Sequence, residues 1–355
     1  MKILFIIPYP TGEAPSQRFR FEQYLDVLNR EGHTLRIVSF LSPGVWKIFY
    51  KKGHFWAKSM GIVKGFFHRI LLLLSVPQYD RVFIHREATP VGPPIFEWII
   101  AKIFRKKIIY DFDDAIWLPN TSKENKVASK FKWHQKTGWI CRWSHLVSCG
   151  NDFLANYAKK YNQKVVLNPT TIDTDYFQGL SSQNPDDQTV TIGWTGTHST
   201  LEYLHALLPI ITQLEKKFNL QFLVISNQSP EFDLDSFQFL PWNKKTEISD
   251  LQKIDIGVMP LENDQWAQGK CGLKALQFMA MGIPVLVSPV GVNTEIVKDG
   301  ENGYLCLNQK DWFNNLEKLI QNENLRKELG KNGRKRVVRD YSKDANSDNF
   351  LSLFA

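Results

Sequence analysis

The sequence has few cysteines and no hydrophobic run long enough to cross a membrane. Its four cysteines, Cys141, Cys149, Cys271 and Cys306, lack the paired spacing of a metal site. Such sparse use predicts reduced thiols in a cytoplasmic protein, with no disulfide. The leucine run in RILLLLSVP is far shorter than the roughly 20 residues that a membrane-spanning helix needs. The opening MKILFIIPYP loses its apolar character at Pro8 and has no cleavage signature, so it predicts a strand and not a signal peptide.

With 355 residues the chain exceeds the usual size of one hydrophobic core, so two domains are expected. The first half alternates β-rich runs with helical stretches, which predicts parallel βαβ units wound on both faces of one sheet. The expected strands are 2–7, 34–40, 81–85, 107–110, 145–149 and 164–168. The expected helices lie near 17–30, 93–105, 122–141 and 151–160.

The same pattern restarts after the polar segment SSQNPDDQ (181–188), which we interpret as a linker. Strands are expected at 190–194, 221–226, 255–259 and 284–288, and helices at about 199–217, 270–281 and 310–321. We therefore place the domains at 1–180 and 181–340, followed by a closing segment, 341–355. Two Rossmann-like halves would bind a ligand in the cleft between them, at the carboxyl ends of their strands.

Three loops of the first half follow strands and should meet at that cleft. Charged residues at such positions often bind ligands. For any single one of them, a charged loop residue that is simply exposed to water is an equally good interpretation. Ser16 can also cap the helix that follows it. The residues are Ser16, Arg18, Arg20, Arg86, Glu87, Asp111, Asp113 and Asp114.

The second half opens with IGWTGTHSTLEYL, in which Gly196 and Thr197 stand between a strand and a helix. Such a turn presents backbone N–H groups to a phosphate. It contains neither G-x-G-x-x-G nor a P-loop lysine, so dinucleotide and triphosphate sites lack their fingerprint. A capped helix start is the alternative interpretation.

The stretch GKCGLKALQFMAMGIPV predicts a helix at 270–281 that is apolar on nearly every face. Lys270, Lys274 and Gln277 share one narrow stripe of it. A lysine in such surroundings is unfavourable unless it is paired. A cation in the first turn also interacts unfavourably with the helix dipole, at a cost of roughly 0.3–1 kcal/mol. We favour an anionic ligand at this helix start over lysines that reach past apolar neighbours to water.

The region 44–74 mixes aromatic and basic residues at helical spacing. This composition suits peripheral binding to an anionic membrane surface, and helices packed on the first domain with solvated lysines explain it equally well. The net charge of +8 agrees with anionic partners. No nucleic-acid recognition module accompanies the basic residues, so no nucleic-acid partner is expected.

Four blocks of the chain resemble retaining glycosyltransferases of family four, and especially a bacterial subgroup of that family. The blocks are S-x-R-x-R at 16–20, HRE…GPP…YDFDDAIW at 85–117, IGWTGTHSTLEYL at 192–204, and MPLENDQW…GKCGLKALQFMAMGIPVLVSPVGVNTEIV at 259–297. The resemblance implies an α/β protein with the GT-B fold, in which two Rossmann-like doubly wound domains face each other across a cleft. It also implies that the C-terminal helix, at about 341–354, returns to the first domain.

In activity, the resemblance implies transfer of a sugar from a UDP- or GDP-sugar to a glycan or lipid-linked acceptor, with retained configuration. No obligatory metal and no cofactor besides the nucleotide-sugar substrate are expected. The implied catalytic residues are Asp113, Lys270 and Lys274. The implied donor-binding residues are Gly196, Thr197, Cys271, Gly272, Gln277 and Glu295. The implied acceptor-side residues are Ser16, Arg18, Arg20 and Arg86.

The sequence departs from the broad family where that family has an E-x7-E pair, because those positions are Gly269 and Gln277 here. Gln277 could still meet the ribose, and the candidates to grip the sugar instead are Glu262, Asp264 and Glu295. The family's histidine after the fourth major strand is replaced by the Asp113 neighbourhood.

The triplet 111–113 also spells the D-x-D that holds a metal in another glycosyltransferase fold, but the repeated domain pattern argues against that fold.

Two rival functions stay open at this stage. One is a nucleotide-sugar epimerase on the same fold, which needs acid–base groups but no acceptor pocket. The other is a non-catalytic nucleotide-sugar-binding protein, which the missing glutamate pair favours.

Overall fold

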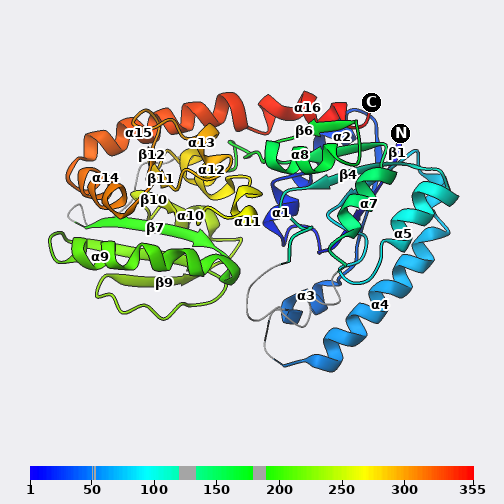
Figure 1. Ribbon diagram of the computed structural model, residues 1–355, viewed down its shortest axis with the longest axis horizontal. Coiled ribbons are helices and arrows are strands. Elements are labelled where there is room, and N and C mark those ends of the chain that lie inside the picture. Colours follow the sequence, from blue (N-terminus) through cyan, green and yellow to red (C-terminus); the bar gives the residue numbers. More distant parts are fainter. Residues whose placement is uncertain (50, 52, 120–132, 179–188) are drawn as a thin grey trace. The chain divides into compact units, whose positions relative to one another are not determined.

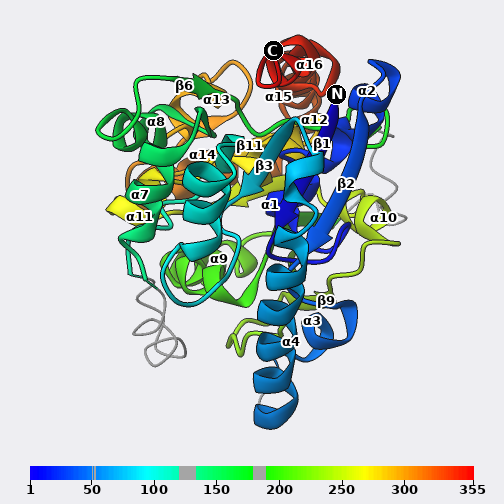
Figure 2. The same cartoon turned by 90° about the vertical axis from the view of Figure 1, so that its right-hand side faces the viewer.

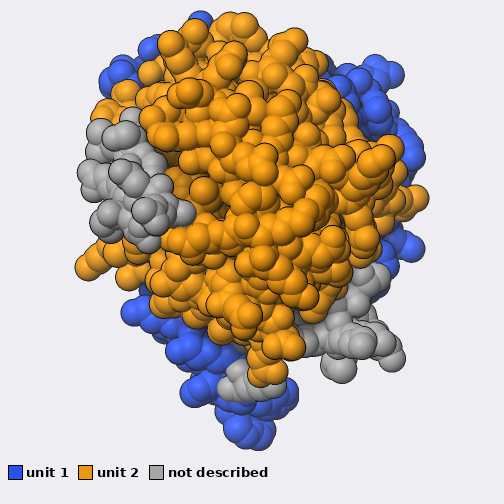
Figure 3. All heavy atoms as spheres, turned by 90° about the vertical axis from the view of Figure 1, so that its left-hand side faces the viewer, with its two compact units in different colours: residues 1–170, 346–355 blue, residues 171–345 orange. Residues whose placement is uncertain are grey.

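The computed structural model describes residues 1–49, 51, 53–119, 133–178 and 189–355. They form two compact units, which Figure 3 colours separately: residues 1–170 with 346–355, and residues 171–345. The division falls at 170/171, ahead of the boundary at 180/181 that the sequence indicates. The expected linker, 181–188, lies outside the described residues.

The first unit is built on a parallel sheet of six strands in the order β2-β1-β3-β4-β5-β6 (Figure 1). All the strands expected in this half are present, but β4 continues through Phe112, so Asp111 lies in the strand and not in the loop after it. Near-continuous apolar runs such as KILFII are typical of parallel strands that are buried on both faces. The strands are β1 (Lys2–Ile7), β2 (Thr34–Ser39), β3 (Arg81–His85), β4 (Lys107–Phe112), β5 (Leu146–Cys149) and β6 (Val165–Leu167).

The helix expected at 17–30 is broken into short pieces. Ser16 lies inside the first piece and does not cap it, because Pro15 already occupies the first helical position and Ala14 is the N-cap. The expected helix at 122–141 lies largely outside the described residues. The helical segments of this unit are α1 (Pro15–Arg18), η1 (Glu22–Tyr24), α2 (Leu25–Arg30), α3 (Pro43–Phe49), α4 (Phe55–Leu73), η2 (Val76–Gln78), α5 (Ile95–Trp98), η3 (Ile99–Ile103), α7 (Lys136–Trp143), α8 (Asp152–Lys159), η7 (Asp344–Asn346, which begins in the second unit) and α16 (Ser347–Ser352).

The second unit holds another parallel sheet of six strands, in the order β12-β11-β10-β7-β8-β9. Neither edge strand was predicted from the sequence, since β12 has only two residues and β9 ends in a proline and is only partly buried. The order is that of the doubly wound Rossmann sheet, with its reversal between β7 and β10. The strands are β7 (Val190–Gly196), β8 (Leu220–Ser226), β9 (Phe237–Pro241), β10 (Ile256–Met259), β11 (Val285–Val287) and β12 (Tyr304–Leu305).

The helix expected at 270–281 begins later than predicted. Gly272 has a φ of 69°, which is left-handed and cannot continue a right-handed helix, so α12 starts at Leu273 and Lys270 precedes it. The stretch expected as a helix at 199–217 starts as a 3-10 segment. The helical segments of the second unit are η5 (His198–Ala206), α9 (Leu208–Glu215), α10 (Glu247–Leu251), α11 (Gln265–Gln268), α12 (Leu273–Ala280), α13 (Asn293–Ile296), α14 (Gln309–Gln321), α15 (Glu323–Arg336) and η6 (Val337–Tyr341).

The C-terminal helix α16 belongs to the first unit. Phe350, Leu353 and Phe354 are buried in the same hydrophobic cluster as Ile3 and Phe5 of β1. The ring of Phe350 stacks on Tyr24 with centroids 4.4 Å apart. The last ten residues therefore complete the core of the unit in which the chain begins.

We predict that Phe350→Ala destabilises the first unit by about 3–5 kcal/mol, because it removes a fully buried aromatic side chain and leaves a cavity. Thermal unfolding followed by circular dichroism measures the effect. Asp348→Ala, an exposed change on the same helix, is the control, for which a loss below about 1 kcal/mol is expected. Equal melting temperatures for Phe350→Ala and the wild type would contradict this role of α16.

Candidate functional site

Each sheet reverses its strand order at one point, and parallel α/β folds bind ligands beyond the carboxyl ends of the strands at such points. The reversal lies between β1 and β3 in the first unit and between β7 and β10 in the second. The candidate residues gather around these ends in two groups. We call them the acidic cluster (His85, Arg86, Asp111, Asp113 and Asp114) and the lysine cluster (Trp194, Gly196, Thr200, Lys270 and Lys274).

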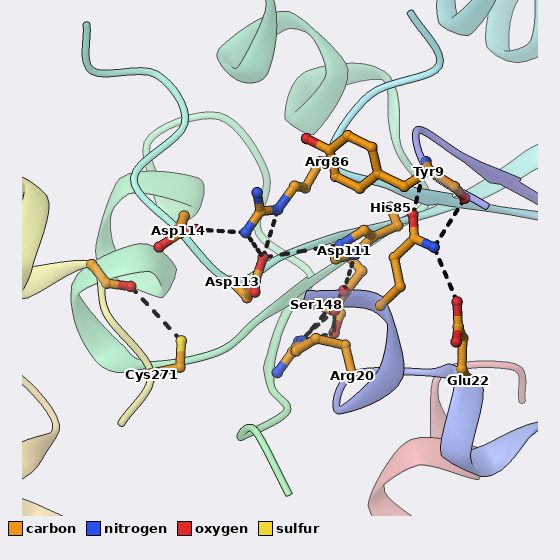
Figure 4. Close-up of polar contacts among 12 residues, drawn as sticks. Tyr9, Arg20, Glu22, His85, Arg86, Asp111, Asp113, Asp114, Ser148 and Cys271 are labelled. Carbon is orange, nitrogen blue, oxygen red and sulfur yellow. Dashed lines mark hydrogen bonds and ion pairs between the residues drawn. The ribbon is translucent and has the colours of Figure 1, made fainter. Parts of the chain in front are cut away.

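Asp111 is the centre of the acidic cluster and is fully buried. Its carboxylate accepts a hydrogen bond from Ser148 Oγ at 2.6 Å and lies 2.9 Å from His85 Nδ1. It also forms an ion pair with the buried Arg20 (Figure 4). Burial raises the pKa of Asp111, but Arg20 and then His85 outweigh it and hold that pKa well below its usual range. Asp111 thus stays ionised and fixes the side chains around it.

Arg20 is an internal partner of this carboxylate. It is 1% exposed, and besides Asp111 it donates to the carbonyl oxygen of Asn168 and, at 3.3 Å, to Ser148 Oγ. The positive charge of Arg20 is therefore neutralised inside the first unit by Asp111. The resemblance, by contrast, assigns Arg20 to the acceptor side. The D-x-D reading loses support for the same reason, because protein donors already engage both oxygens of Asp111.

His85 connects Asp111 to Asp113. Since the ionised Asp111 only accepts hydrogen bonds, His85 Nδ1 carries a proton. Its Nε2 lies 4.0 Å from Asp113 Oδ1 and, within the described part of the chain, has no hydrogen-bond partner. His85 was missed as a site residue although it stands in the quoted HRE motif, because a histidine at the end of a strand gives no signal by itself.

Arg86 holds the two remaining acids. Its Nε donates to Asp113 Oδ1 at 2.8 Å and its guanidinium also contacts Asp114 Oδ2 at 2.5 Å. Burial lowers the pKa of Arg86, but Asp113 and Asp114 outweigh it, so that the pKa lies well above its usual value. The backbone of Arg86 is left-handed, with a φ of 58°, and Tyr110 Oη donates to its carbonyl oxygen at 2.6 Å. Such strain is typical of functional positions.

The other acceptor-side candidates, Ser16 and Arg18, lie in α1 after β1, and both are partly buried. The guanidinium carbon of Arg18 lies 5.0 Å from the ring centre of Phe19. Through Asp111 and His85, the acidic cluster connects Arg20 to Arg86 and Asp113, which are three of the predicted residues. Ser16 lies in α1.

Lys274 is the centre of the lysine cluster. Its Nζ lies 3.2 Å from Thr200 Oγ1 and 4.3 Å from the centre of the Trp194 ring. Gly196 provides the space, because a Cβ there would lie 2.8 Å from that Nζ. Burial lowers the pKa of Lys274, and the nearby Lys270 lowers it further, to about 7. No carboxylate of the described residues forms an ion pair with Lys274.

The residues just before α12 form a tight turn. Lys270 lies over the ring of Trp266, with Nζ 5.2 Å from its centre. The thiol of Cys271, drawn in Figure 4, donates to the carbonyl oxygen of Gly269 at 3.7 Å. Gly272 needs its left-handed φ, and any Cβ there would run into Ile296. The turn thus brings two lysines near the start of one helix.

Gln277 faces a carboxylate that the sequence analysis missed. Its Nε2 donates to Glu247 Oε1 at 3.4 Å, and both side chains are buried. Glu247 lies in α10, in a segment without any recognisable strand-turn-helix motif, so no sequence signal pointed to it. Of the proposed substitutes for the family's glutamates, Asp264 caps α11 by accepting from Ala267 N at 2.6 Å, and Glu295 is exposed in α13.

Thr197 ends the loop after β7 as the N-cap of η5. Its hydroxyl lies 2.9 Å from Ser199 Oγ, and its carbonyl oxygen accepts a bond from Thr200 Oγ1 at 3.0 Å. With Lys274 on the other side of Thr200, the loop after β7 and the start of α12 are joined by one hydroxyl. Cations, hydroxyls and the free N–H groups of a helix start suit a phosphate group.

Residues 221–336 match the family model Glycosyl transferases group 1. Among curated proteins, the chain is 27% identical over 166 residues to the capsular polysaccharide biosynthesis glycosyltransferase CapM of Staphylococcus aureus. That match covers 42% of each protein, so the chain aligns with less than half of this relative's length. The matched segment lies within the second unit.

Solved structures resemble the whole chain. A sucrose-phosphate synthase from Thermosynechococcus elongatus is 14% identical with a TM-score of 0.71, over 99% of this chain and 98% of that one. Anabaena HepE in complex with UDP-glucose is 13% identical with a TM-score of 0.65, over 100% and 99%. These likenesses, with the two six-stranded parallel sheets, confirm the predicted GT-B fold.

We predict that Asp111→Asn destabilises the first unit by about 3–5 kcal/mol, because it leaves the buried Arg20 without its counter-charge. The melting temperature at pH 7 measures this. Since the pKa of Asp111 is lowered in the folded state, its contribution is present above the ordinary carboxyl pKa and is lost as the pH falls below about 4. The difference from the wild type should therefore shrink in acid.

The control is Asp26→Asn, which breaks an exposed pair with Arg30 in the same unit and should cost at most about 1 kcal/mol. An Asp111→Asn protein as stable as this control would show that the buried pair does not hold the cluster together.

Proposed function

We propose that this protein is a retaining, metal-independent glycosyltransferase that moves a sugar from a nucleoside diphosphate donor to a glycan or lipid-linked acceptor. The second unit would bind the donor and the first unit the acceptor. The observation that carries the proposal is Lys274, a partly buried lysine held against Trp194 and Thr200 at the start of α12, next to Lys270. It lies in the segment that matches the Glycosyl transferases group 1 model.

The proposed role of the lysines follows from the charge of the leaving group. A departing nucleoside diphosphate gains negative charge on its phosphate oxygens, and preorganised cations and N–H dipoles stabilise that charge best where water is excluded. Lys270 and Lys274, with the N–H groups near Gly272, supply such donors. They would perform the charge neutralisation for which other phosphate-transfer sites use a metal ion.

Binding of the donor would also relieve two unfavourable features of the second unit. Lys274 is partly buried without a carboxylate partner among the described residues, and it lies in the first turn of a helix, where a cation opposes the dipole. A diphosphate at this place would supply an anionic partner for Lys274, next to Lys270. The UDP complexes of Anabaena HepE, a protein of the same fold, make a nucleotide the natural first ligand to test.

In the first unit, Asp113 is the carboxylate that we assign to the acceptor. Arg86 Nε donates to its Oδ1, and His85 Nε2 lies 4.0 Å from the same oxygen, so its orientation is restricted. We propose that it accepts a hydrogen bond from the attacking hydroxyl group. Arg18 and Ser16 would contact more distant parts of the acceptor, whereas Arg20 acts through Asp111.

The test is nucleotide binding and turnover by Lys274→Met and Lys270→Met. Methionine keeps most of the side-chain stem but removes the charge. We predict that each variant binds UDP or GDP roughly 10- to 100-fold more weakly, the loss expected for one charge-assisted hydrogen bond. Thermal shift and calorimetry measure binding, and release of nucleoside diphosphate from UDP- and GDP-sugars measures turnover, with and without a chelator.

Lys253→Met is the matched control, because it removes a half-exposed lysine of the same unit that pairs with Asp250. It should bind nucleotide like the wild type. Unchanged binding and turnover in both lysine-cluster variants would refute the proposed donor site. Turnover that stops with a chelator, or a product of inverted configuration by NMR, would refute the corresponding part of the mechanism.

A further inference from the structure

Helix α4 exposes a row of large apolar side chains to solvent. The exposed fractions run from 47% for Leu71 to 83% for Trp56. In Figures 1 and 2, α4 is a long helix whose N-terminal end points away from the sheet of the first unit. We call this row the α4 stripe; its residues are Trp56, Met60, Val63, Phe67, Ile70, Leu71 and Leu74.

The stripe follows the helix period. Its members stand at i, i+4, i+7, i+11, i+14, i+15 and i+18, which confines them to a sector about 100° wide. An ordinary surface helix turns such a sector toward the core. In α4 this apolar sector faces solvent instead, so it does not contribute to the core of the first unit.

The opposite face of α4 is fixed to the first unit. Arg69 is 1% exposed and donates to the backbone carbonyl oxygens of Ala88, Val38 and Ile7. Gly65 packs so closely on the ring of Phe40 that a Cβ would lie 2.7 Å from it. The helix therefore cannot rotate to bury the stripe, and no described residue of the chain covers it.

The charge of this region is of one sign. From Gly32 to Tyr79 the sequence contains no aspartate or glutamate, while it contains Lys47, Lys51, Lys58 and Lys64. Lys64 is exposed and lies beside the stripe on the helix. A second copy of the chain would bring the same cations face to face in a twofold contact, which is unfavourable. An anionic surface with an apolar interior complements both the charge and the stripe.

We propose that the α4 stripe docks the protein on the surface of an anionic phospholipid bilayer. The apolar side chains enter the boundary between headgroups and acyl chains, Trp56 lies at the interface, and the lysines face the headgroups. In the described part of the chain no helix is both long and apolar enough to span a bilayer. The helix thus lies in the plane of the membrane. This inference does not depend on the proposed transfer reaction.

The experiment is co-sedimentation of the full chain with vesicles of phosphatidylcholine containing phosphatidylglycerol, and with vesicles of phosphatidylcholine alone. We expect binding to the anionic vesicles that weakens as salt is raised. Met60→Asp with Phe67→Asp should lower the partition coefficient roughly tenfold or more, since it removes two apolar side chains from the inserted face and adds two anionic ones. Both residues are exposed, so the melting temperature should not change.

Leu307→Asp is the matched control, because Leu307 is a highly exposed leucine of the second unit that lies outside the stripe. This variant should bind vesicles like the wild type. Failure of the wild type to bind either vesicle would overturn the proposal. So would stripe variants that bind as well as the wild type. A concentration-dependent dimer that the stripe variant abolishes, without vesicle binding, would assign the stripe to a contact between two copies instead.

Discussion

The position of the Lys274 ammonium group is the constraint on which the second unit's chemistry depends. It is held between the Trp194 ring and Thr200, next to Lys270, without a paired carboxylate among the described residues. Two glycines make this arrangement possible. Gly196 leaves room for the ammonium group, and Gly272 takes the left-handed turn that starts α12. A site so arranged is unfavourable when empty and favourable around an anion.

The acidic cluster of the first unit differs from the lysine cluster, because its charges are already paired within the protein. Asp111 engages Arg20 and His85, and Arg86 engages Asp113 and Asp114. These pairs fix geometry and leave little net charge. The first unit therefore holds a preformed polar framework around a strained Arg86, and the second holds Lys274, which has no carboxylate partner among the described residues. This asymmetry is what different roles for the two units in a transfer reaction would require.

Much of the fold could be predicted from local pattern. Buried parallel strands are uniform apolar runs, so KILFII and RVFIH were found with their correct ends. The edge strands β9 and β12 were missed, since short or half-buried strands have no such pattern. The start of α12 was placed too early because a helical period does not reveal a glycine with positive φ. Similarly, the period of α4 predicts a helix but not that its apolar stripe faces solvent.

The candidate residues could be predicted by their place after strands, but their partners could not. Nothing local to Arg20 reveals a counter-charge 91 residues away. Glu247 carries no motif, and its contact with Gln277 arises only when α10 folds against α12. Sequence patterns thus identify which loops reach the ends of the sheet, whereas long-range pairing decides which charges remain available for a ligand.

The most direct test of the proposed donor site is the proton balance of nucleotide binding. Burial and the nearby Lys270 lower the pKa of Lys274 to about 7, and a bound diphosphate favours its charged form. Binding of UDP or GDP at pH 7.5 to 8 should therefore take up a proton. Calorimetry in buffers of different ionisation enthalpy measures that uptake. The account predicts uptake in the wild type that Lys274→Met abolishes. Tight nucleotide binding with no uptake, or the same uptake in Lys274→Met, would contradict it.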